Sequence, residues 1–168
     1  MKISKHFNLS EFKNVYPHPD LIFLLERIRE EAGLPVKITD STRSPKEHVD
    51  TYVKLSKDKK IKTAENGLGL KSIMESIPWD SRHLPTFVET PVKNKINTEY
   101  QTISKAPYLR AVDFMIIGKN GTPLSGEAIK KIILKIRTPE INIGLGVGRT
   151  YCHLDVGRIT DAEWKYGY

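Results

Sequence analysis

The stretch Arg110-Ala111-Val112-Asp113-Phe114-Met115-Ile116-Ile117 is an apolar run with one acid inside it. Such a run is typical of a buried strand. A buried carboxylate is costly unless it is paired or bound to a metal, so Asp113 needs a partner. A second strand, Tyr151-Cys152-His153-Leu154-Asp155-Val156, carries His153, with Asp155 two positions on and therefore on the same face. Together these residues predict a polar site built on adjacent strands.

Each of these residues also has a simpler interpretation. Asp113 could accept hydrogen bonds from a turn, and His153 could be a core histidine whose hydrogen bonds are satisfied. Cys152, the single cysteine of the chain, excludes a disulfide framework. It is better explained as a small core residue than as a soft metal ligand, because it points to the opposite face from His153.

Helical periodicity outside these strands predicts two helices. Pro19 to Ala32 has apolar residues at helical spacing, and Gly33 is a natural stop. Ser125 caps a second helix from Gly126 to about Arg137. Shorter strands are expected over Pro35–Thr39 and Ile143–Val147, and Lys119-Asn120-Gly121 is a turn. The fold class is therefore α+β, with a small antiparallel sheet flanked by helices in a single domain over residues 1–168.

The stretch from about residue 46 to residue 103 resembles an insertion on this domain. Lys46–Lys57 and Leu68–Ile77 could form short helices, and three prolines make the remainder loop-like. An insertion of this length is usually a functional cover or a surface for a partner.

Composition limits the classes of function. The 168 residues are 39% hydrophobic and 28% charged, a soluble globular profile. No apolar run reaches the roughly 18 residues of a membrane span, and the start lacks the apolar region of a secretory signal peptide. We expect synthesis in the cytoplasm. The net charge of +7 suggests an anionic partner, and nucleic acid, a membrane surface and the bacterial cell wall all qualify on charge alone. No nucleic-acid recognition motif accompanies the charge.

The sequence resembles the zinc peptidases that cleave D-Ala-D-Ala and peptidoglycan stem peptides, including phage endolysins. Their pattern Ser-x-His-x-x-Gly-x-Ala-x-Asp aligns with Ser104 to Asp113, and the later strand histidine aligns with His153 in a His-x-Asp-Val ending. Weaker similarities, in the same order, cover nearly the whole chain: Phe7 to Phe12, Leu25 to Ile38, Thr42-Arg43-Ser44-Pro45 and Trp164. The stretch 46–103 has no counterpart in the family.

The resemblance implies a Hedgehog/DD-peptidase-like fold and a zinc site. Asp113 and His153 are the implied metal ligands, Ser104 and Arg43 the implied substrate-binding residues. Arg43 is also the implied catalytic group that stabilises charge on the substrate oxygen. Zinc bound by two imidazoles and a carboxylate leaves a position open for water.

Two departures from the family pattern affect this site. Ala106 stands where the first ligand histidine is expected, and its methyl group cannot bind metal. The usual proton-shuttle positions hold Tyr151 and Thr150, which are poor bases at neutral pH. Asp155 is the substitute we consider for the shuttle, and His83 or His48 could replace the missing ligand.

Two functions therefore stay open. The first is a zinc-dependent peptidase acting on peptidoglycan stem peptides, impaired or inactive as the sequence stands, that reaches the cell wall after release or within a virion. The second is a catalytically dead binding or structural protein on the same fold, such as a phage virion component, whose insertion contacts other phage proteins. Ala106 is either an introduced replacement of histidine or a natural loss.

Overall fold

The chain divides into two compact units, one formed by Met1–Thr42 with Tyr108–Tyr168 and the other by Arg43–Pro107. The computed structural model describes residues 1–43, 45–57, 81–83, 87–88, 102–103 and 108–166. The second unit contains the predicted insertion 46–103. The predicted helix over Leu68–Ile77 lies outside the described residues.

A five-stranded sheet forms the centre of the first unit, in the order β1-β4-β6-β5-β7. Its strands are β1 (Val36–Asp40), β4 (Ala111–Ile116), β6 (Cys152–Val156), β5 (Ile143–Val147) and β7 (Ala162–Lys165). The two strands predicted to carry the polar site, β4 and β6, are antiparallel neighbours in the middle of the sheet. The α+β class is confirmed.

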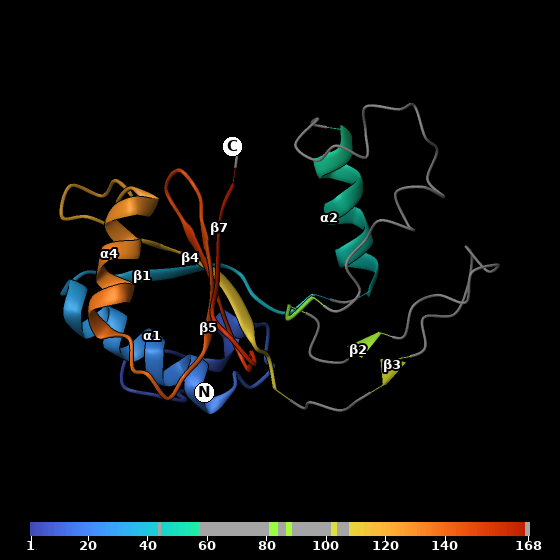
Figure 1. The fold of residues 1–168 in the computed structure, drawn as a ribbon, viewed down its shortest axis with the longest axis horizontal. Coiled ribbons are helices and arrows are strands. Elements are labelled where there is room, and N and C mark those ends of the chain that lie inside the picture. Colours follow the sequence, from blue (N-terminus) through green and yellow to red (C-terminus); the bar gives the residue numbers. More distant parts are fainter. Residues whose placement is uncertain (44, 58–80, 84–86, 89–101, 104–107, 167–168) are drawn as a thin grey trace. The chain divides into compact units, whose positions relative to one another are not determined.

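One face of the sheet is apolar and packs against helices. Side chains of alternate positions on β4, β6 and β5 belong to the buried core with apolar residues of α1 (Pro19–Ala32) and α4 (Gly126–Ile136). Both helices lie on the same side of the sheet (Figure 1). Because strand side chains alternate, the intervening residues, Asp113 and His153 among them, lie on the other face.

The two helices begin and end where the sequence predicted. Pro19 occupies the first turn of α1, and Gly33 ends that helix with a left-handed φ of 59°. The Ser125 side chain accepts a hydrogen bond from the backbone N–H of Ala128 at the start of α4, at 3.2 Å. A short 3-10 helix, Leu9–Phe12, precedes α1.

The prediction of an antiparallel sheet was wrong for its last strand, because β7 runs parallel to β5. The loop after β6 carries the chain past the beginning of β5 to the outer edge of the sheet. Asp161 fixes this crossing by accepting a hydrogen bond from the backbone N–H of Ile143 at 2.8 Å and by pairing with Arg137. The sheet is therefore mixed.

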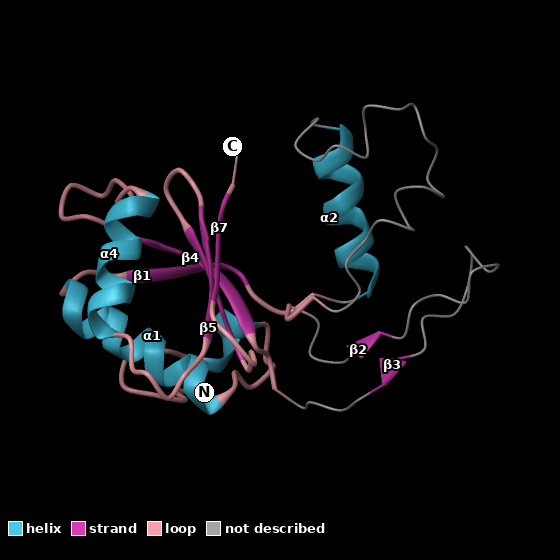
Figure 2. Ribbon diagram, viewed as in Figure 1, coloured by secondary structure: helices cyan, strands magenta, loops and turns pink. Residues whose placement is uncertain are grey.

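The described part of the second unit contains one helix and one pair of short strands. Helix α2 spans Pro45–Lys57, which confirms the helix predicted over Lys46–Lys57. Strands β2 (Phe87–Val88) and β3 (Thr102–Ile103) pair in antiparallel fashion (Figure 2). None of the helices in the described ranges combines the length and apolar character needed to cross a membrane.

Two neighbouring residues of α4 test the packing of this helix. Ile133 is 1% exposed and Leu134 is 47% exposed. We expect Ile133→Ala to lower the free energy of unfolding by about 2–5 kcal/mol, because it leaves a cavity in the core. Leu134→Ala, the matched control, should change it by less than about 0.5 kcal/mol. Urea denaturation followed by circular dichroism measures both, and equal losses would contradict the packing described.

Candidate metal centre

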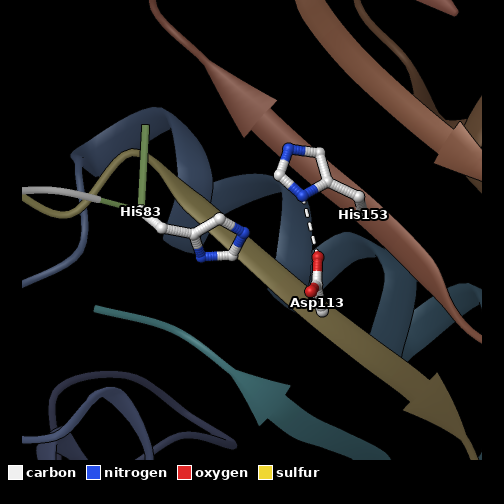
Figure 3. A group of neighbouring side chains, drawn as sticks. All are labelled: His83, Asp113 and His153. Carbon is white, nitrogen blue, oxygen red and sulfur yellow. Dashed lines mark hydrogen bonds and ion pairs between the residues drawn. The ribbon is translucent and has the colours of Figure 1, made fainter. Parts of the chain in front are cut away.

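Asp113 and His153 face one another at the middle of the sheet. They are direct cross-strand partners on β4 and β6. Their side chains point toward each other (Figure 3), with 2.8 Å between Asp113 Oδ1 and His153 Nδ1. His153 is 7% exposed. The predicted polar site on adjacent strands is thus a carboxylate–imidazole contact on the face opposite the helices.

The other ring nitrogen of His153 contacts a second carboxylate. His153 Nε2 lies 3.1 Å from Asp155 Oδ2. Arg158 donates two hydrogen bonds to Asp155, from Nε to Oδ1 at 2.5 Å and from Nη2 to Oδ2 at 2.6 Å. His153 therefore lies between two carboxylates, and Arg158 pairs with one of them, Asp155.

Two glycines of β5 leave room for this arrangement. Gly144 and Gly146 are the cross-strand partners of Asp155 and His153. A Cβ atom at Gly144 would overlap Asp155 Oδ2 and the Arg158 guanidinium, and one at Gly146 would lie 2.6 Å from Trp164 Nε1. A larger residue at Gly144 would displace the Asp155–Arg158 pair, and one at Gly146 would displace the Trp164 and Tyr166 rings.

Trp164 closes one side of the His153 ring. It pairs with Gly146 from β7, and its ring centroid lies 5.2 Å from that of His153. The Arg158 guanidinium lies over the same indole, 5.5 Å from its centroid. The imidazole thus contacts a carboxylate at each nitrogen and packs against a tilted indole ring.

Opposing influences set the pKa of His153. Burial is the largest of them and lowers the pKa, but hydrogen bonds and charges from Asp113 and Asp155 together raise it above its ordinary value. Burial likewise acts to raise the pKa of Asp155, yet His153 and Arg158 lower it below the usual range. In the metal-free state the site therefore favours a protonated imidazole between two carboxylates.

Cys152 is a core residue, as predicted. It is fully buried, and its thiol donates to the carbonyl oxygen of Gly126 at 3.4 Å, on the helix side of the sheet. Burial raises the pKa of the thiol to about 12. A thiol with that pKa on the face opposite His153 is not a ligand for the same ion.

The other residues predicted from the sequence belong to the second unit. Ser104 and Ala106 lie outside the described residues. Arg43 is the first residue of that unit, and its backbone N–H donates to the carbonyl oxygen of His83 at 2.9 Å. His48 lies in α2 with its ring centroid 5.0 Å from that of Tyr52, a contact within the helix.

His83, Asp113 and His153 make up a His/Asp group that could hold a metal ion, since each offers one atom of a kind that binds metal. Figure 3 labels all three. Nitrogen and oxygen ligands of this kind suit zinc, which takes three protein ligands in catalytic sites. Asp113 and His153 supply two of the three from adjacent strands. This donor set is of a kind that fits a zinc ion.

A second group that could hold a metal is His6, Glu26 and Glu30. Glu26 accepts the backbone N–H of His6 at 2.8 Å and contacts its ring Nδ1 at 2.5 Å. Lys5 donates to Glu30 at 2.9 Å. These contacts join the N-terminal segment to α1, and this structural role is sufficient to explain the group.

No protein-family model matches this sequence, and it matches no curated protein and no solved structure either. Any assignment of function must therefore be argued from the residues of the chain itself.

The raised pKa of His153 makes the stability of the metal-free protein depend on pH. A histidine with a raised folded-state pKa stabilises the fold fully below its unfolded pKa, and this contribution disappears as the pH rises through the folded pKa. We expect the urea midpoint of the wild type, measured with a chelator, to fall relative to that of His153→Gln as the pH rises above about 6.5, the ordinary histidine pKa, and through the raised folded-state pKa. Asp155 stays ionised throughout this window because its pKa is lowered. Parallel curves for the two proteins would contradict the prediction.

Proposed function

We propose that this chain is a zinc-dependent peptidase-fold protein directed at peptidoglycan stem peptides. The observation that carries the proposal is the Asp113–His153 pair, two ligand types of zinc peptidases at facing positions of β4 and β6. The resemblance of Ser104 to Asp113 and of His153 to Val156 to the D-Ala-D-Ala and endolysin peptidases supports the same class.

We further propose that His83 supplies the ligand that Ala106 lacks. His83 is buried and stands in a Ser-x-His sequence, Ser81-Arg82-His83, like the missing ligand of the family pattern. His83 lies 30 positions before Asp113 in the sequence.

His83 and Arg43, the proposed catalytic arginine, are joined within the second unit. The Arg43 N–H donates to the His83 carbonyl oxygen at 2.9 Å. The proposed ligand and the proposed catalytic group are therefore linked by a backbone hydrogen bond.

In this proposal the residues of the chain have distinct roles. Asp113, His153 and His83 hold the ion. The Arg43 guanidinium stabilises negative charge developing on the substrate oxygen, and Ser104 binds the substrate. When bound in such a site, zinc polarises a carbonyl group and makes water more acidic. Trp164 shields one side of the His153 ring from solvent.

The partner and the place of action follow from the same proposal. The net charge of +7 favours association with anionic wall polymers over long range. We propose that the protein meets peptidoglycan after release from the cell or as part of a virion, with residues 46–103 available to contact other phage proteins.

A catalytically dead binding or structural protein on the same fold is the second candidate function. The observation that favours it is Ala106, which removes a ligand from the family pattern. Its fold, sheet and core would be the same, so metal content distinguishes it from the peptidase.

Zinc content of the purified full chain tests the proposed function. We expect the wild type to bind a single zinc ion and to release stem-peptide fragments from peptidoglycan. His83→Ala and His153→Ala should each weaken binding by orders of magnitude, because each removes a ligand. His48→Ala is the matched control, another buried histidine of the second unit, and should leave zinc binding unchanged.

An Ala106→His variant separates the two candidate functions. If only this variant binds zinc and cleaves peptidoglycan, His83 is not the third ligand and the chain with Ala106 is an inactive form of the peptidase. If neither protein binds zinc, the peptidase proposal is wrong and the binding or structural function replaces it.

A further inference from the structure

The Asp155 carboxylate is almost completely buried, and both of its oxygens are engaged by neighbouring side chains. Its side chain is 2% exposed. One oxygen accepts a hydrogen bond from Arg158, and the other accepts one from Arg158 and contacts His153. A general base must reach the proton that it removes, directly or through one water. These contacts instead direct Asp155 toward His153.

The two nitrogens of His153 face different groups. Nδ1 points toward Asp113 and Nε2 toward Asp155. A neutral imidazole carries one N–H and one lone pair, and a histidine that binds metal usually donates its remaining N–H to a carboxylate or a carbonyl. With the proton on Nε2, the lone pair of Nδ1 is directed toward Asp113, the other proposed ligand on the sheet.

We infer that Asp155 is a positioning residue: it accepts the Nε2–H of His153 and so presents Nδ1 to the metal ion. This inference rests on the proposed metal site and deepens it. It replaces the role of proton shuttle considered for Asp155 from the sequence. The consequence is a carboxylate–histidine–metal arrangement along a single strand, within the His153-Leu154-Asp155 segment of β6.

Further residues hold Asp155 in this role. Arg158, in the turn after β6, binds both carboxylate oxygens, and such bidentate pairing fixes the plane of a carboxylate as well as its charge. Trp164 lies under the Arg158 guanidinium, and Gly144 leaves the space that the pair occupies. The chain of contacts therefore runs from Trp164 through Arg158 and Asp155 to His153.

Zinc affinity of the full chain, measured by competition with a chromophoric chelator, tests the inference. We expect Asp155→Asn to bind zinc about 10–100-fold more weakly than the wild type, the usual effect of losing such a partner. The double variant Asp155→Asn/Arg158→Gln removes both charges together. It should show the same loss, which excludes an unpaired arginine as the cause.

Asp161→Asn is the matched control. Asp161 also pairs with an arginine, Arg137, and accepts a backbone N–H at the edge of the same sheet, but it does not contact His153. It should lower the urea midpoint and leave zinc affinity unchanged. The absorption spectrum of the Co²⁺-loaded protein gives a second readout, since altered ligation by His153 changes it and lost stability alone does not.

The outcomes separate the inference from the proposed function. If the wild type binds zinc and Asp155→Asn binds it equally tightly with the same Co²⁺ spectrum, the metal site stands and the positioning role is wrong. If the wild type binds no zinc, both are wrong. If Asp155→Asn does not fold, Arg158→Lys, which keeps the charge but loses the bidentate geometry, should still weaken zinc binding, and unchanged affinity there would overturn the inference.

Discussion

The contact between Asp113 and His153 puts an ionisable pair in the middle of a sheet, where a lone charge would be strongly unfavourable. The surrounding residues satisfy this constraint. Asp155 engages the second nitrogen of His153, Arg158 neutralises Asp155, and Trp164 covers the imidazole. Each of these groups has a partner of matching charge or shape, and this offsets the free-energy cost of burying it.

The division of the sheet into two faces makes this arrangement compatible with a stable fold. One face of β4, β5 and β6 is wholly apolar and packs on α1 and α4, so the core does not depend on the polar groups. The other face is free to carry chemistry because β5 offers glycines where larger side chains would collide with the polar groups. Stability and the proposed metal site thus occupy opposite faces of the same strands.

Much of the fold could be predicted from local pattern. Helix α1, helix α4 and the central strands follow from periodicity and capping residues, which act within a few positions of the chain. Strand β7 was not predicted, because Ala162–Lys165 is short, mostly polar and only half-buried. Its parallel pairing depends on a loop anchored by Asp161, a long-range contact that no local pattern reveals.

The candidate site was predictable only in part, for the same reason. Asp113 and His153 were noticeable as polar residues inside apolar strands. Arg158 was not recognised as a site residue, since its role depends on contacts that the folded turn creates. The alternating glycines at positions 144 and 146 indicated that other side chains lie close over β5. Which side chains these are could not be predicted, because that depends on the pairing register of β5 with β6. His83 was a candidate from its Ser-x-His sequence alone.

The most direct test of the central claim is anomalous scattering at the zinc edge from crystals of the full chain grown with zinc. We expect an anomalous peak bordered by the Asp113 carboxylate and His153 Nδ1, with Nε2 of the same ring donating to Asp155. A direct Asp113–His153 hydrogen bond that persists in the presence of zinc, with no peak beside it, would contradict the claim that this pair is a metal centre.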